Sequence, residues 1–275
     1  MSFTTADVVK LRKVTGAGMM DCKNALNDAE GNFDRALEII REKGKLVASK
    51  RADRDAAEGV VLSKVNADNK FGAMVVLNCE TDFVAKNENF VAFAESILDL
   101  ALANKATSLE SVKALVLDGR TVEAQVTEQT GVIGEKIDLS YFNSISAETV
   151  ISYIHPGNKL ATLVGFNKAG VEVQVAKDVA MQVAAMAPIA VDKNSVPQEV
   201  IEKELEIAKE KYRQEGKPEA MLDKIAQGSL NKFFQESTLL NQTYVKDGKI
   251  SIKQFLTQND KALTVTTFDR YSLNA

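Results

Sequence analysis

An internal repeat constrains the fold of this chain more than any other feature. NKFGAMVVLN at 69–78 resembles NKLATLVGFN at 158–167, an offset of 89 residues. A second β-like run precedes each copy, VVLSKV at 60–65 and TVISYI at 149–154. Two apolar runs joined by a short polar turn are typical of a β-hairpin, so the repeat predicts two similar hairpins.

The two copies differ in the connection that follows each hairpin. Alanine-rich amphipathic helices are predicted at 90–103 and 174–185, where Val91 matches Val175 at an offset of only 84. The first copy therefore has about five extra residues, and they lie within CETDFVAKNEN at 79–89. Structural contacts would be expected in both copies, so the asymmetry favours a functional loop.

The first segment, 1–44, is predicted to be a small module of three helices. Thr4 and Asp7 have the spacing of a capping box, TGAG at 15–18 interrupts the helical pattern, and Gly44 is expected to end the third helix. Three short helices bury little apolar surface, which favours a partner-directed role. The mixed charges of 45–58 predict a solvated helical linker.

The remaining segments complete an α+β fold. Residues 59–146 and 147–196 are predicted as two core subdomains, each a small antiparallel sheet packed with helices. The stretch 107–136 reads as two helical pieces, and KIDLSYFNSIS at 136–146 is expected to add a strand to the second sheet. The last segment, 237–275, is expected to return a final strand to the central sheets.

Segment 197–236 has the pattern of an antiparallel coiled-coil hairpin that protrudes from the body. In its first arm, apolar residues recur at steps of 4, 3 and 4, namely Ile201, Leu205, Ala208 and Tyr212. GKP at 216–218 supplies the turn, and the second arm has comparable spacing. The pattern leaves two roles open, a rigid spacer or an oligomerisation and docking arm.

Charge and composition exclude several classes of protein. The formal net charge of −4 provides no field that would recruit nucleic acid or an anionic membrane, and no apolar run approaches a membrane span. Charged residues near the start, among them Asp7 and Lys10, argue against a signal peptide, so a cytoplasmic location is expected. Cys22 and Cys79 are expected to be reduced, buried thiols.

Few residues suggest catalysis. The one histidine, His155, lies in HPGN, which has the composition of a turn and lacks further metal ligands nearby. The sequence has no GxxxxGK[ST], GxGxxG or GxSxG motif. We therefore expect a non-enzyme without cofactor or metal, with an enzyme of unknown type as the disfavoured alternative.

Two apolar positions have competing interpretations. Phe83 follows Thr81 and Asp82 in a connection that should be polar, and its ring either packs in the core or faces a partner. Met19 and Met20 are adjacent on a predicted helix, so one of them should lie near the surface.

Four stretches together resemble the hallmark motifs of bacterial elongation factor Ts: TGAGMMDCKNAL at 15–26, VVLNCETDFVAKNENF at 75–90, MQVAAMAP at 181–188 and ESTLLNQTYV at 236–245. The resemblance covers essentially the whole chain. It implies a UBA-like N-terminal module and a guanine nucleotide exchange factor that releases GDP from the GTPase elongation factor Tu. Some family members pair through the core and others do not, which leaves a homodimer open.

The resemblance also implies roles for individual residues. An exchange loop, which we define as residues 81–84, would press on the GTPase near its nucleotide and comprises Thr81, Asp82, Phe83 and Val84. Partner-binding positions would be Arg12, Met19 and Met20 in the N-terminal module, with Met181 and Gln182 in the helix of the second repeat. The alternative is a non-catalytic coiled-coil protein whose hairpin mediates interaction or dimerisation.

Overall fold

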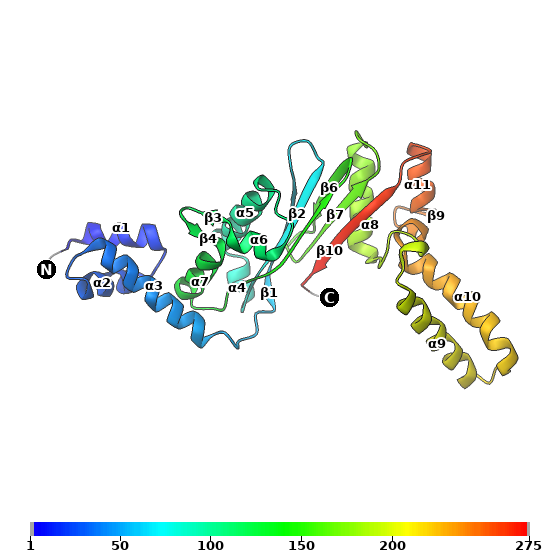
Figure 1. The fold of residues 1–275 in the computed structure, drawn as a ribbon, viewed down its shortest axis with the longest axis horizontal. Helices are drawn as coiled ribbons and strands as arrows, with labels where there is room; N and C mark the ends of the chain where they lie inside the picture. The colour runs from blue at the N-terminus through cyan, green and yellow to red at the C-terminus, as the bar shows by residue number, and fades with distance from the viewer. Residues whose placement is uncertain (1–2, 274–275) are drawn as a thin grey trace.

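The computed structural model describes residues 3–273, and these form an elongated α+β protein (Figure 1). Three helices lie at one end, two small antiparallel sheets with flanking helices lie in the middle, and two long helices extend from the other end. The predicted α+β class is therefore confirmed. Residues 1–2 and 274–275, the ends of the first and last predicted segments, lie outside the described part. No described helix is both long and apolar enough to cross a membrane.

The N-terminal helices are α1 (Thr5–Thr15), α2 (Met19–Asp28) and α3 (Phe33–Lys50). The predicted capping box is present, since Thr4 Oγ1 accepts from the Asp7 amide and Asp7 Oδ2 accepts from the Thr4 amide. Gly16 ends α1 with a φ of 71°, a left-handed conformation that favours glycine. The helices share a small core built around Leu11, Cys22, Ala25, Leu26 and Ala36.

The prediction that Gly44 ends the third helix is wrong, because α3 continues to Lys50. Gly44 instead lies where α3 crosses α7 (Val122–Ile133). A Cβ on Gly131 of α7 would lie only 2.2 Å from the Gly44 Cα. Arg41 of α3 and Glu128 of α7 form an ion pair at 3.5 Å beside this crossing. Gly131 therefore permits close helix packing, and residues 45–50 of the predicted linker are helical.

The first sheet has the order β1-β2-β5, with strands β1 (Glu58–Val65), β2 (Phe71–Cys79) and β5 (Asp138–Ser146). The second has the order β10-β7-β6, with strands β6 (Thr149–Ile154), β7 (Leu160–Phe166) and β10 (Val265–Ser272). All pairings are antiparallel. Both predicted hairpins and the returning final strand are confirmed.

The expectation that 136–146 joins the second sheet is wrong. This segment forms β5, which pairs with β2 of the first sheet, for example Val75 with Phe142. The placement buries both faces of the strand, since Leu139 and Phe142 pack with the helices of the first subdomain while Ile145 faces the second sheet. The third position of the second sheet is filled by β10 instead.

The two sheets pack against each other and are covered by helices on their outer sides (Figure 1). Met74 and Val76 of β2 contact the second sheet, and every residue of β2 is buried. Gly72 marks the closest approach, since a Cβ there would lie 2.8 Å from Val150 Cγ1. Helix α5 (Glu88–Ala103) covers the first sheet and α8 (Val173–Met186) covers the second.

The turn of each hairpin is hydrogen-bonded to the first strand of the other hairpin. The Val150 amide donates to the Asn69 carbonyl at 2.6 Å, and the Val61 amide donates to the Asn158 carbonyl at 2.7 Å. Both pairs of equivalent residues are 89 positions apart, and both asparagines have a φ of 56°. The sequence repeat therefore forms a structural repeat with approximate two-fold symmetry between its hairpins.

The two long helices, α9 (Gln198–Gln214) and α10 (Glu219–Ser237), pack together as an antiparallel pair (Figure 1). Ala208, Leu222, Ala226 and Leu230 are buried along their contact, and Ser229 Oγ donates to Tyr212 Oη at 3.1 Å. The shorter elements are α6 (Leu109–Ala114), β3 (Val116–Leu117), β4 (Arg120–Thr121), η1 (Lys193–Ser195), η2 (Leu239–Asn241), β8 (Thr243–Tyr244), β9 (Asp247–Ser251) and α11 (Ile252–Asn259).

The crossing of α3 and α7 generates a stability prediction. Gly131→Ala should lower the free energy of unfolding by about 1–3 kcal/mol, because its Cβ has no space beside the α3 backbone. Gly44→Ala is the matched control, since a Cβ at that position would meet the Gly131 Cα at an ordinary 3.6 Å. Thermal unfolding of the two variants measures the difference, and equal midpoints would contradict the described packing.

Candidate functional site

The extra residues of the first repeat form a short helix that the second repeat lacks. After β2 ends at Cys79, α4 (Asp82–Ala85) precedes α5. After β7 ends at Phe166, the chain reaches α8 at Val173 through bends alone. The asymmetry predicted between the repeats thus lies at α4, which contains three of the four exchange-loop residues.

Phe83 is the most exposed large apolar side chain of the described residues, at 83%. The interpretation that its ring packs in the core is therefore wrong. The next residues of the same helical turn point the other way, since Val84 packs on the first core and Ala85 is buried. An exposed ring on a turn anchored by its neighbours is the arrangement expected of a contact with another molecule.

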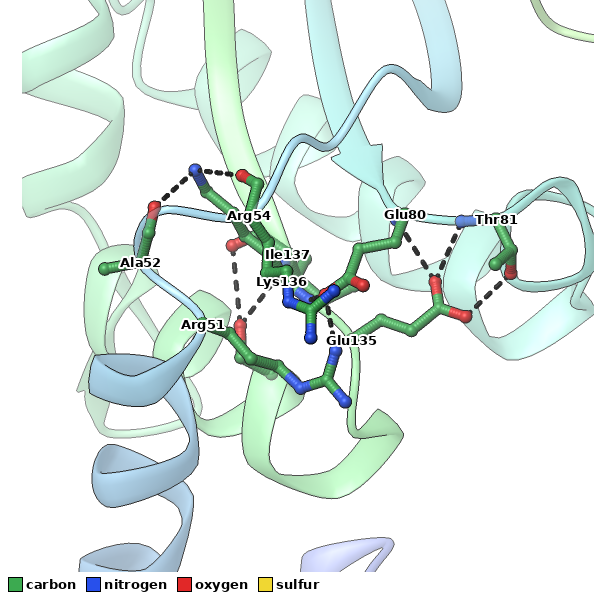
Figure 2. A network of polar contacts seen from close by, with 9 residues as sticks. Arg51, Ala52, Arg54, Glu80, Thr81, Glu135, Lys136 and Ile137 are labelled. Atoms are coloured by element: carbon green, nitrogen blue, oxygen red, sulfur yellow. Dashed lines mark hydrogen bonds and ion pairs between the residues drawn. The ribbon is translucent and has the colours of Figure 1, made fainter.

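Thr81 is the N-cap residue of α4, and the side chain of Glu135 holds Thr81 in place (Figure 2). Glu135 Oε2 accepts from the Glu80 amide at 3.1 Å and from the Thr81 amide at 3.0 Å, while Oε1 accepts from Thr81 Oγ1 at 2.7 Å. Thr81 Oγ1 in turn accepts from the Val84 amide at 3.5 Å. One carboxylate therefore fixes the start of the loop.

The side chain of Glu80 also holds the start of the loop, by binding Lys136 and Arg51 (Figure 2). Its Oε1 accepts from the Lys136 amide at 2.6 Å and from Arg51 Nη1 at 2.7 Å. These two donors, the amide foremost, hold the pKa of Glu80 below its usual range. Lys136 Nζ donates to the carbonyls of Ala52 and Arg54. We call Arg51, Glu80, Thr81, Glu135 and Lys136 the base network.

Asp82 already has a partner in the residue that directly follows its helix. Its carboxylate accepts from Lys86 Nζ at 2.6 Å, and this bond lowers the pKa of Asp82. The side chain of Asp82 is 41% exposed, so the pair lies at the surface. Asp82 is thus ionised at neutral pH, and a contact with a partner would have to compete with Lys86.

The structure brings the N-terminal module close to the exchange loop. Gly16 of the TGAG stretch and Val84 line the same hollow, together with Phe90 and Val132. A second, more apolar hollow lies on the module itself and is lined by Phe3, Thr4, Thr5, Val8, Met19, Met20 and Lys23. Met20 is 64% exposed and Met19 39% exposed, and Arg12 is exposed as well. These residues form an exposed surface on the module.

Met181 and Gln182 lie elsewhere, on α8 outside the second sheet (Figure 1). Met181 is 37% exposed, but Gln182 is fully buried. Gln182 Nε2 donates to the Thr243 carbonyl at 3.0 Å, and its Oε1 accepts from the Val245 amide at 2.9 Å. A buried, fully bonded amide does not fit the prediction that Gln182 contacts a partner directly. It fixes the 243–245 segment against α8.

The cysteines and the histidine, the other side chains that could be reactive, form no site in the described residues. Cys22 and Cys79 are free and buried, as predicted, and burial together with the nearby Glu135 raises the pKa of Cys79 to about 12. His155 lies in a turn, where its Nδ1 is 3.0 Å from Tyr153 Oη. Within residues 3–273, no cluster of three or more histidine, cysteine or acidic side chains could hold a metal ion.

Sequence reasoning did not identify Glu80, Glu135 or Lys136. Glu135 lies more than fifty positions from the residues that it binds and belongs to no recognisable pattern, while Glu80 lies in the CETDFVAKNENF stretch but was assigned no role. Only the pairing of β5 with β2 brings the two segments together. The lysine partner of Asp82 could have been identified, because Lys86 is four residues further along a helical segment.

Comparison with known proteins shows similarity to one family along the full length. The family model described as Elongation factor TS matches residues 80–275. The elongation factor Ts of Porphyromonas gingivalis is 53% identical over 277 residues, covering 100% of both chains. That of Azobacteroides pseudotrichonymphae is 51% identical over 274 residues, covering 100% of this chain and 99% of the relative. That of Christiangramia forsetii is 53% identical, covering 98% of each.

The contrast between Phe83 and the cysteines generates a labelling prediction. A maleimide at neutral pH should leave Cys22 and Cys79 of the native protein unmodified, because both are buried and the raised pKa of Cys79 keeps it a thiol. Phe83→Cys should be modified at once, and mass spectrometry after brief labelling reads the difference. Rapid native labelling of Cys79, or protection of the new cysteine, would contradict the described loop.

Proposed function

The chain belongs to the elongation factor Ts family, and we propose that its exchange loop disturbs the nucleotide site of a partner GTPase. Members of this family are nucleotide exchange factors in translation elongation, and this is the function of the chain. The partner that the family implies is elongation factor Tu. Exchange requires no chemical reaction by the factor, only differential binding to states of the GTPase.

The chemistry of GDP binding indicates where such a factor must act. A GTPase holds GDP through P-loop amides, a lysine and a Mg²⁺ ion. Mg²⁺ needs near-ideal octahedral geometry, so a small displacement of the surrounding side chains weakens its binding. A factor that binds the displaced arrangement therefore favours GDP release. By linkage, GDP weakens the binding of the factor by the same ratio.

The single observation that carries this proposal is the 83% exposure of Phe83 on a short, anchored helix. Phe83 acts as a wedge that enters the GTPase near the Mg²⁺ and phosphate site, with Asp82 beside it. Burying a phenylalanine contributes about 1.5–3 kcal/mol. A coupling of about 10⁴-fold needs about 5.5 kcal/mol, so the ring requires further contacts to hold it in place.

Those further contacts come from two other surfaces. Arg12, Met19 and Met20 grip a helix of the GTPase domain. Their exposure favours this role, and Met19 and Met20 line an apolar hollow on the module. Met181 reaches another domain of the same partner from α8. Gln182 supports that contact indirectly, since its bonds hold the 243–245 segment against α8.

We also propose a division of the chain into functional units. The UBA-like grip module extends beyond 1–44 through the end of α3 at Lys50, which shortens the 45–58 linker. The other units are the subdomains 59–146 and 147–196, the coiled-coil hairpin 197–236 and the returning segment 237–275. Exposed Ile207 and Met221 on the hairpin favour a docking arm over a simple spacer, and a homodimer is one use for such an arm.

Replacing Phe83 tests the wedge directly. Phe83→Ala should reduce the maximal rate of GDP release from elongation factor Tu by about 10- to 100-fold, the equivalent of losing one buried ring. Affinity for the nucleotide-free GTPase should fall much less. Release of fluorescent GDP is followed at rising factor concentrations, and Val116→Ala, an exposed apolar residue on β3, is the control. Equal losses in rate and affinity would rule out the wedge.

Replacing Met20 should give the opposite pattern. Met20→Ala removes part of the grip, so the concentration of factor needed for half-maximal GDP release should rise by about tenfold. The maximal rate should change little, because Phe83 still reaches the nucleotide site. The same titration measures both quantities. A lowered maximal rate at unchanged half-saturation would show that Met20 does not act as a grip.

A further inference from the structure

Two carboxylates near the start of α4, those of Glu80 and Glu135, each bind the backbone of the other's segment. Glu135 lies in the turn after α7, where Gly134 has a φ of 80°, and it accepts from the amides of Glu80 and Thr81. Glu80 lies at the end of β2 and accepts from the Lys136 amide. Residues 80–81 and 135–136 are thus connected in both directions (Figure 2). Such a reciprocal arrangement restricts rotation and sliding of the loop more than a single bond would.

Hydrogen-bond donors surround both glutamates, and one of these donors, Arg51 at Glu80, is charged. Every bond to the two glutamates comes from an amide, a hydroxyl or Arg51, and bonds to an ionised acceptor are stronger than neutral ones. Because the pKa of Glu80 is lowered, its contribution is present above the ordinary glutamate pKa. It is lost only as the pH falls through the lowered value.

The same residues connect the loop to the N-terminal module. Arg51 directly follows α3, and its guanidinium binds Glu80. Lys136 Nζ binds the carbonyls of Ala52 and Arg54 in the segment that leaves α3. The same group of side chains therefore holds both the segment that follows α3 and the start of α4. This group lies where the chain leaves α3 for β1.

The short helix cannot maintain its own direction. Helix α4 has four residues, and an isolated helix of that length is unstable in water. Its capping bond, from the Val84 amide to Thr81 Oγ1, is long at 3.5 Å. Glu135 holds that same hydroxyl at 2.7 Å. The direction in which Phe83 points therefore depends on Glu135 and on the packing of Val84 and Ala85.

We propose that Glu135 is a positioning residue for nucleotide exchange. With Glu80 as its counterpart, it holds the exchange loop in its active direction in the free protein and sets its distance from the N-terminal grip. The inference rests on the proposed function, because Glu135 acts through Phe83. Without Glu135, the loop must be ordered during the exchange step itself, which slows that step.

The test compares GDP release by five proteins: the unchanged chain, Glu135→Ala, Glu135→Gln, Phe83→Ala and the Phe83→Ala/Glu135→Ala double variant. Glu135→Ala should lower the maximal rate by about tenfold, as expected for losing bonds to a charged acceptor. Half-saturation should change little. Glu135→Gln should retain most of the rate, since its amide oxygen can accept both backbone bonds and its NH₂ group can donate to Thr81 Oγ1. The double variant should be no slower than Phe83→Ala.

Each other outcome has a distinct meaning. A normal rate for Phe83→Ala would overturn the proposed wedge itself. A slow Phe83→Ala with a normal Glu135→Ala would leave the wedge intact and overturn the positioning role. Equal slowing by Glu135→Ala with and without Phe83 would show a general structural effect and would also overturn that role.

Controls separate positioning from folding. Glu95→Ala, an exposed glutamate on α5, should release GDP at the unchanged rate. Thermal unfolding checks that each variant is folded. If Glu135→Ala unfolds, Glu135→Asp replaces it, because aspartate keeps the charge but is one methylene too short to reach both amides. A folded Glu135→Asp with an unchanged maximal rate would then overturn the inference.

Discussion

Two backbone hydrogen bonds join the halves of the core, from Val150 to Asn69 and from Val61 to Asn158. Each is made by the turn of one hairpin and the first strand of the other, so neither hairpin can shift without breaking both. They place the sheets close enough for Met74 and Val76 to be buried, and for Gly72 to be required at the closest approach. As a result β2 is buried on both faces and forms a rigid strand that ends at Cys79. The exchange loop begins immediately beyond that end.

The proposed mechanism depends on where the two halves differ. The second repeat passes from strand to helix through bends, whereas the first inserts α4 and exposes Phe83. A helix of four residues is too short to hold a ring in one direction, so the surrounding segments must do it. Glu135 and Glu80 anchor the loop to the turn before β5, and Arg51 and Lys136 extend that anchor to the segment after α3. These hydrogen bonds thus connect the loop that carries Phe83 to the N-terminal module that carries Met19 and Met20.

Local sequence patterns predicted the structural features that depend on residues close together in the sequence. The repeat offset identified both hairpins, and the change of offset located the inserted loop. Spacing alone could not assign β5 to a sheet, because its alternation suits either one. Gly44 resembled a helix end because the α7 glycine that it packs against is 87 positions away. The family resemblance assigned Gln182 to a partner contact, whereas its amide binds the backbone of Thr243 and Val245, which no local pattern could show. Glu135 carried no signal, since its role exists only after the sheets form.

The central claim is that the free protein already holds the exchange loop in its active direction. Amide hydrogen exchange of residues 80–85 tests it most directly, in the free protein and bound to nucleotide-free elongation factor Tu. The amides of Glu80 and Thr81 donate to Glu135, and that of Ala85 donates to the Thr81 carbonyl. These three amides should be protected in the free protein and should change little on binding. Rapid exchange in the free protein, with protection appearing only in the complex, would contradict a preformed loop.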